Sequence, residues 1–327
     1  MNRTCVLAIT LLCLAGLAGA NEANPDTTSP EIDEAGLEVV LVLGEQPGPA
    51  LWKVSSGEHA MWILGEISPY PLKAKWRSKR FETLLGNSQE LLLDFSGYWR
   101  AGNNDTRRLA YAEKLPDGVS LKDVISPDLH KRFEVTARRF HATGLEELRP
   151  FAATNRLVVS AMESMDMKAF SARFAVASLA RKGRIKITYF AAPEIAFDER
   201  LLNWQHASNS ICLERLIGVI GDGGSGVRRL ANAWSVGDIG ALRQLVPAFS
   251  FSRDGFRAGP CAAAMHGGER QAANYKLRRT QAWMGAAKRS LKSNRRTMAV
   301  VPMSELFAPD GYLATLRAEG LEITEPE

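Results

Sequence analysis

The sequence predicts an α/β fold in which a mixed β-sheet is assembled from the N- and C-terminal halves of the chain. From about residue 115 onward helical patterns dominate, until strand-like segments return near the C-terminus. Strands at both ends with helices between them favour one sheet, interrupted by a helical insertion at about residues 107–292. The apolar stretches typical of strands lie at 51–55, 60–68, 90–95 and 297–303.

Apolar runs and glycines define the N-terminal elements. LEVVLVL at 37–43 predicts a first strand, and the segments 51–55 and 60–68 predict a hairpin because a glycine lies in the short turn between them. WRSKRFETLLG at 76–86 predicts a helix that ends at its glycine. The uninterrupted apolar run ELLLDF at 90–95 predicts a strand covered on both faces of the sheet.

The middle of the chain shows clear helix signals. Ser126 as the N-cap, Pro127 at the first helical position and Gly144 beyond the end predict one helix. Residues 167–183 predict a second helix that leads into a strand at 184–190. The remaining elements are predicted in the order helical block 202–245, long helical segment 263–293, strand 297–303, helix 310–320 and strand 321–323.

The first twenty residues predict a secretory signal peptide. Arg3 precedes an apolar run from Cys5 to Leu17, and AGA follows as a small-residue cleavage site. The run is shorter than the roughly 20 residues that cross a bilayer, and no second candidate follows, so we expect no transmembrane helix in the mature chain. Residues 21–36 are acidic and contain two prolines, which predicts a disordered leader before a single domain at 37–327. We therefore expect an exported protein, periplasmic or secreted.

Composition argues against a nucleic-acid partner. The chain has 41 basic and 36 acidic residues, a net charge of +5, and the basic residues are scattered without interleaved aromatic residues. Nucleic-acid grooves concentrate basic charge on one face. We expect the partner to be an unknown ligand or an envelope protein instead.

Two cysteines remain after removal of the signal peptide, Cys212 and Cys261. An even number of cysteines in an oxidising compartment favours one disulfide bond between them. Two buried thiols are the alternative.

None of the common catalytic motifs is present. The chain has no nucleophile elbow, P-loop, H-E-x-x-H or C-x-x-C motif, and its five histidines lie in unrelated contexts. His130 and His141 lie on one charged helix, where we expect both to be solvated. GDGGSG at 221–226 follows no predicted strand, so it predicts a flexible connection between helices rather than a phosphate-binding loop.

Several separated segments resemble the TraB/GumN family, which is related to the Tiki-type metalloproteases. The resemblance implies an erythromycin-esterase-like mixed sheet and spans most of the mature chain. It is carried by the segments 51–71, 88–95, 231–245, 278–283 and 299–323.

The resemblance also implies where a catalytic site would lie, and both of its histidines are replaced here. The family's first segment normally closes on Gly-Thr-x-His, and Ser68 stands at that histidine, with Glu66 in place of the threonine. The second histidine, in Gly-x-x-His, corresponds to Glu305. The family's strand acid matches Asp94, and the arginine before the helix tryptophan matches Arg279.

Loss of both histidines predicts loss of the family's metalloprotease-like chemistry. Imidazole binds first-row transition metals well, whereas a neutral serine hydroxyl does not. Glu66 and Ser68 are two residues apart on a strand and should share a face. Ser68 has no matched histidine to activate it as a nucleophile. Glu66, Asp94 and Glu305 could converge around Arg279 as a salt-bridge knot or a polar binding cleft.

Two other arrangements remain open for these carboxylates. They could hold a hard divalent metal on an oxygen-only site, or Glu66 or Glu305 could simply face solvent. The leading hypothesis is a non-catalytic member of the family that acts by binding, with no cofactor. The alternatives are a metal-dependent hydrolase or peptidase that uses the carboxylates, and a structural partner protein of the envelope.

Overall fold

The fold is seen in a computed structural model that describes residues 48–71, 76–95, 113–168, 172–191, 207–249, 263 and 268–326. The chain from Glu45 to Glu327 forms one compact unit. The predicted signal peptide, leader and first strand lie outside the described residues. The described elements form a mixed α/β fold, as the sequence predicts.

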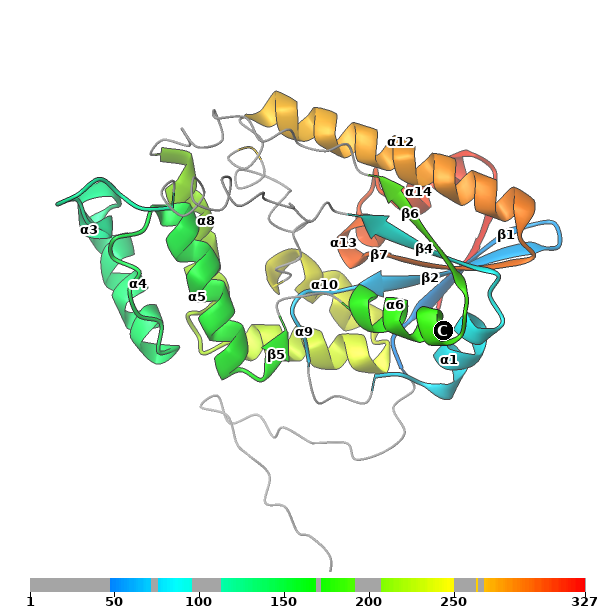
Figure 1. The fold of residues 1–327 in the computed structure, drawn as a ribbon, viewed down its shortest axis with the longest axis horizontal. Coiled ribbons are helices and arrows are strands. Elements are labelled where there is room, and N and C mark those ends of the chain that lie inside the picture. Colours follow the sequence, from blue (N-terminus) through cyan, green and yellow to red (C-terminus); the bar gives the residue numbers. More distant parts are fainter. Residues whose placement is uncertain are drawn as a thin grey trace, which may run out of the picture. The chain divides into compact units, whose positions relative to one another are not determined.

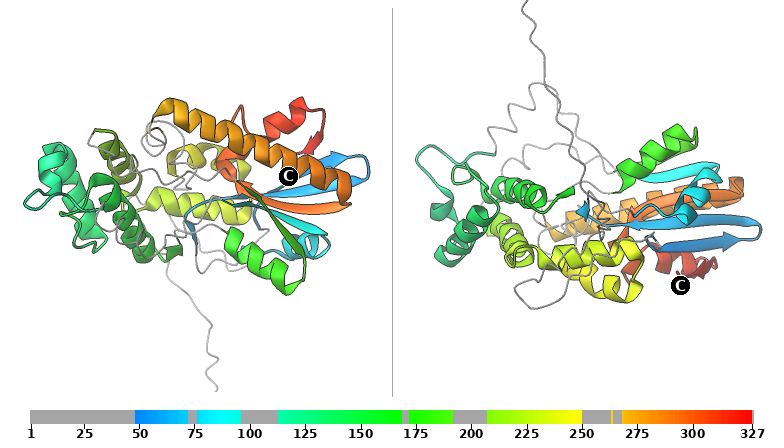
Figure 2. Two further views of the ribbon diagram at one scale, coloured as in Figure 1. Left: turned by 45° about the horizontal axis from the view of Figure 1, so that its top comes forward. Right: turned by 90° about the horizontal axis from the view of Figure 1, so that it is seen from below.

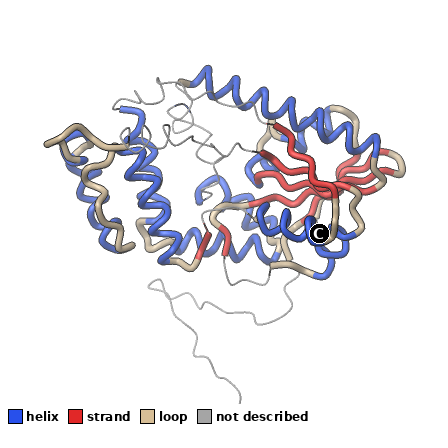
Figure 3. Tube along the Cα trace, in the orientation of Figure 1, coloured by secondary structure: helices blue, strands red, loops and turns tan. Residues whose placement is uncertain are grey.

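A six-stranded mixed sheet has the strand order β6-β4-β7-β2-β1-β8 (Figures 1 and 3). β6, β4, β7 and β2 run parallel to one another, whereas β1 pairs antiparallel with β2 and with β8. β2 and β7 are far apart in the sequence, so their pairing confirms that both ends of the chain build the sheet. The strands are β1 (Leu51–Ser56), β2 (His59–Glu66), β4 (Glu90–Phe95), β6 (Lys186–Ala191), β7 (Arg296–Pro302) and β8 (Glu322–Thr324).

Helices cover both faces of this sheet (Figures 1 and 2). The long helix α12 (Glu269–Ser293) contacts β1, β2, β4, β6 and β7 and places Trp283 in the core. On the opposite side lie α1 (Lys79–Gly86), which begins at the N-cap Ser78, and α6 (Arg173–Lys182). Burial on both faces explains why the inner parallel strands β4, β7 and β2 read as apolar runs, whereas β6 at the sheet edge is partly exposed.

The last two residues of β2 meet different neighbours because side chains alternate along a strand. A Cβ added at Gly65 would lie 2.6 Å from the end of the Met303 side chain, so a larger residue here would require that side chain of α13 (Met303–Phe307) to shift. The next residue, Glu66, forms an ion pair with Arg173 of α6.

The remaining described helices pack mainly on one another (Figure 2). α5 packs against α8, α8 contacts α4 and α9, and α9 packs against α10. The helices are α3 (Leu121–Val124), α4 (Pro127–Arg139), α5 (Pro150–Ser164), α8 (Ala207–Ile220), α9 (Ser225–Val236), α10 (Ile239–Phe249) and α14 (Tyr312–Ala318). No helix among the described residues is both long and apolar enough to cross a membrane.

Two helix boundaries differ from the prediction. α4 begins as expected, with the Ser126 side chain accepting a hydrogen bond from a backbone N–H, but it ends at Arg139. His141 has the left-handed φ of 53°, which stops the helix before the expected Gly144. The segment expected to be helical from residue 167 begins with a short strand, β5 (Met167–Lys168), that pairs with β3 (Tyr70–Pro71).

The GDGGSG segment connects α8 to α9, as predicted. The Asp222 carboxylate accepts hydrogen bonds from the backbone N–H groups of Gly224 and Gly226 and from the Ser225 hydroxyl. Burial raises the pKa of Asp222, but these hydrogen bonds outweigh it and hold the pKa below its usual value. The aspartate therefore occupies the N–H groups that a phosphate would need.

Candidate functional site

The positions that match the family's site lie at the carboxyl edge of the parallel strands. Glu66 ends β2 and is level with Pro302 at the end of β7. Glu305 follows on α13, and Asp94 occupies the end of β4 opposite Phe190 of β6. The fold thus brings these backbone positions to one edge, where α/β sheets commonly bind ligands. The side chain of Asp94 lies outside what the structure describes.

Glu66 is a buried carboxylate held by an arginine of α6. Only 2% of the residue is exposed. The Arg173 guanidinium donates from Nε to Oε2 at 3.1 Å and from a terminal nitrogen to Oε1. Both carboxylate oxygens are therefore engaged by the rigid fork of one cation. The alternative in which Glu66 faces solvent is wrong.

The cation on Glu66 was predicted to be Arg279, and the structure instead provides Arg173. Nothing in the sequence motif singled out Arg173, because it is brought to β2 by the packing of a separate helix. Arg279 is 97% buried on α12, which Figure 1 shows on the other side of the sheet from α6. Arg279 and Glu305 each have polar partners, and a knot between them and Asp94 stays a prediction.

The end of β2 is also fixed from α9. The buried Trp234 indole donates a hydrogen bond from Nε1 to the Gly65 carbonyl oxygen at 2.7 Å. Its ring packs on Trp76, with the ring centroids 5.2 Å apart. Ser68, at the first histidine position, is 94% buried and has a polar partner of its own. A serine and an ion-paired glutamate thus stand where the resemblance implies the family's histidine segment, and the Trp234 indole holds the carbonyl that precedes them.

In a comparison with protein-family models, the chain matches the TraB/PrgY/gumN family over residues 50–325. The chain belongs to this family. The match covers most of the chain and includes residues 65–68 and 302–305, where the resemblance implies the family histidines. Comparisons with curated proteins and with solved structures gave no match.

A second buried carboxylate lies at the opposite, amino edge of the sheet in this TraB/PrgY/gumN family chain. Glu90, at the start of β4, accepts hydrogen bonds from Ser290 at 2.6 Å, from Asn294 at 2.7 Å and from Thr188. Lys186 lies 3.2 Å away. Burial raises the pKa of Glu90, but the hydrogen bonds from Ser290, Thr188 and Lys186 outweigh it, so the pKa is lowered. These contacts join β4 to β6 and α12.

A hollow of about 500 Å³ opens at the same amino edge. His59 lies in it, and its Nδ1 is 2.8 Å from the Asn294 carbonyl oxygen. Since a carbonyl only accepts, Nδ1 carries the proton and Nε2 is left for another contact. No sequence motif connects His59 with the lysines of α12. The hollow is lined by Ser56, His59, Lys288, Leu291, Lys292, Glu319 and Leu321.

Only one cysteine of the predicted disulfide bond, Cys212, is among the described residues. Cys212 is buried on α8, with 1% of the residue exposed. Cys261 lies outside the described residues. The bond between them stays a prediction.

Proposed function

We propose that this TraB/PrgY/gumN family protein is exported, lacks metallohydrolase activity and acts by binding. The observation that carries the proposal is the Glu66–Arg173 ion pair at the position of the family's metal-binding segment. A carboxylate with both oxygens on a guanidinium is neither a ready metal ligand nor an effective general base. Ser68, beside it, cannot replace an imidazole on a transition metal.

The binding role is supported by the hollow at the amino edge of the sheet. Its volume of about 500 Å³ falls in the range of small-molecule sites. His59, Lys288 and Lys292 line it with a single carboxylate, Glu319, which pairs with Lys288 at 2.7 Å. This balance favours a small anionic ligand with an apolar part that can contact Leu291.

Hydrolysis assays test the loss of catalysis. The purified mature chain is incubated with a fluorescent unfolded protein and with an ester substrate, in the presence of Mn²⁺, Zn²⁺ or Co²⁺ and with chelator. We expect no metal-dependent turnover. Turnover that needs a metal and falls in Glu305→Gln would contradict the proposal and favour the hydrolase alternative.

Binding in the hollow is tested with two probe anions, citrate and inorganic phosphate. We expect at least one to raise the thermal unfolding midpoint of the wild type and to have less effect on Lys292→Gln. Arg278→Gln, on an exposed part of the same helix, is the matched control. An equal response in both variants, or none in the wild type, would contradict binding at this site.

Export is tested by expressing the full chain in a bacterium and analysing the periplasmic fraction. We expect the N-terminus of the recovered protein to be Asn21. Retention of residues 1–20 on a cytoplasmic protein would rule out the signal peptide.

A further inference from the structure

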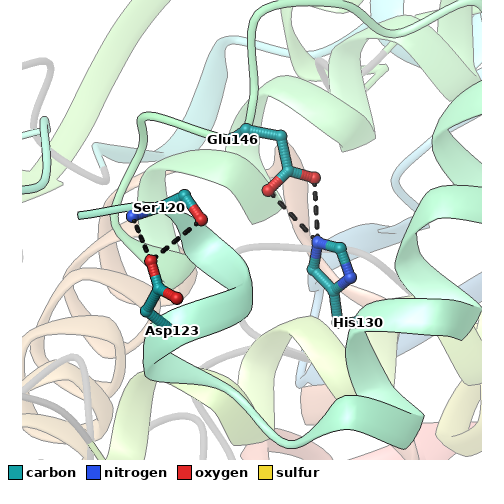
Figure 4. A network of polar contacts seen from close by, with 4 residues as sticks. All are labelled: Ser120, Asp123, His130 and Glu146. Atoms are coloured by element: carbon teal, nitrogen blue, oxygen red, sulfur yellow. Dashed lines mark hydrogen bonds and ion pairs between the residues drawn. The ribbon is translucent and has the colours of Figure 1, made fainter. Parts of the chain in front are cut away.

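A cluster of one histidine and two glutamates lies on α4 and the segment that follows it, outside the site described above. One ligand atom from each of His130, Glu134 and Glu146 lies within 4.8 Å of the others. Figure 4 shows the His130 ring and the Glu146 carboxylate facing each other. His130 was expected to be solvated, and this expectation is wrong, because only 16% of its side chain is exposed.

Local structure fixes the positions of all three residues. His130 and Glu134 are four residues apart on α4, so their side chains lie on the same face of the helix. Glu146 comes from the following segment, and its carbonyl accepts a hydrogen bond from the Leu121 N–H at 2.7 Å. This backbone bond places the Glu146 carboxylate beside the imidazole, with Nε2 3.0 Å from Oε1 and 3.2 Å from Oε2.

Two cations of neighbouring positions, Arg132 and Lys114, form ion pairs with carboxylates outside the cluster. Arg132, also on α4, forms ion pairs with Asp128 at 3.3 Å and with Glu214 at 3.0 Å. Lys114 pairs with Glu147 rather than with Glu146. The cluster is thus left with two carboxylates and one imidazole, and it has an excess of negative charge when the imidazole is neutral.

We propose that His130, Glu134 and Glu146 bind a divalent transition-metal ion, Zn²⁺ in particular. The set offers one imidazole nitrogen and two carboxylates, which are ligands that zinc accepts, with water in the remaining position. Nε2 of His130 would exchange its contact with Glu146 for the metal and must be unprotonated to do so. An imidazole ligand also favours zinc over calcium or magnesium, which take oxygen ligands.

The spacing of the three donor atoms predicts a moderate affinity for zinc. Donor atoms around zinc lie roughly 2.0–2.2 Å from the ion, so pairs of donors are closer together than 4.8 Å. Small side-chain rotations must bring the three together, and Glu134 is exposed. The bound ion would link α4 to the segment at Glu146 and stabilise this part of the helical region.

Calorimetric titration of the metal-free mature chain with ZnCl₂ tests the site. We expect one site, with an affinity reduced at least tenfold in Glu134→Gln and in His130→Asn. Glu134 is exposed, so its variant should fold even where His130→Asn does not, and thermal unfolding checks both. His141→Asn on exposed backbone beyond α4, and Glu305→Gln at the family position, are the controls and should bind zinc as the wild type does.

Every outcome of this titration decides the proposal. Absence of zinc binding, or binding unchanged in a folded Glu134→Gln protein, would overturn it. Loss of zinc binding in Glu305→Gln instead would indicate that the metal site lies at the carboxyl edge of the sheet. That result would also contradict the proposed loss of the family's metal site, whereas failure of the α4 site alone would leave that proposal intact.

Discussion

At the scale of single residues, the two buried carboxylates of the sheet have different interaction partners. Glu66 is neutralised by one guanidinium, whereas Glu90 is satisfied by hydroxyl, amide and ammonium donors. A buried ion pair contributes little net stability when formed, but losing one partner leaves an uncompensated charge. The two sites therefore respond differently to substitution.

Removing Arg173 should destabilise the protein strongly. We expect Arg173→Ala to lower the free energy of unfolding by about 3–5 kcal/mol, because the Glu66 carboxylate stays buried without its cation. The double variant Glu66→Leu with Arg173→Met should recover most of this loss, since no charge remains. Chemical denaturation measures both. Arg295→Ala, which removes an exposed ion pair with Glu58, is the control and should change stability by less than about 0.5 kcal/mol.

Glu90 should make stability depend on pH in the acidic range. Its pKa is lowered in the folded protein from 4.5, so its contribution is present above the unfolded value and is lost as pH falls through the folded value. We expect Glu90→Gln to cost about 1–3 kcal/mol at pH 7. The cost should shrink below about pH 4. If Glu90→Gln lowers the free energy of unfolding equally at pH 7 and pH 3, the lowered pKa of Glu90 is contradicted.

At the scale of elements, the sheet strands and most helices follow from local sequence patterns. The β1–β2 hairpin, the ELLLDF strand and the capped start of α4 form where predicted. The segment from residue 167 differs from its predicted helix because its apolar spacing suits a helix, while its first two residues pair with β3. Pairing with a distant strand is tertiary information that no local window contains.

The candidate site shows the same division between local and tertiary information. The replaced family positions could be located from the sequence alone, because they lie in short matching segments. Arg173 and Trp234 could not, since each reaches the end of β2 from a helix elsewhere in the chain. The group of His130, Glu134 and Glu146 could not be recognised from the sequence either, because sixteen residues separate Glu146 from His130 and only the fold brings them together.

The contact between α9 and β2 should matter for stability. We expect Trp234→Phe to lower the free energy of unfolding by about 1–3 kcal/mol, because the buried Gly65 carbonyl loses its donor. Urea denaturation measures the change. Trp62→Phe, on a half-buried ring beside Lys53 and Arg80, is the matched control and should cost less. Equal costs would mean that the Trp234 hydrogen bond contributes nothing specific.

At the scale of the whole molecule, one compact unit holds the sheet together with the helices inserted between its strands. The predicted Cys212–Cys261 bond would add a covalent link within the insertion. We expect no thiol to react with an alkylating agent in the denatured mature protein, and two to react after reduction, as measured by mass spectrometry. Reduction should lower stability by roughly 3–4 kcal/mol. Two reactive thiols without reductant would contradict the bond.

The pairing of β2 with β7 has a consequence for how the protein folds. These two neighbours lie near the middle of the sheet, yet more than two hundred residues separate them. Contacts between such distant segments slow folding, because a long loop must close before they form. The sheet cannot be completed until β7 has left the ribosome. Until then β2 exposes an unpaired edge, which is the period in which a chaperone would be needed most.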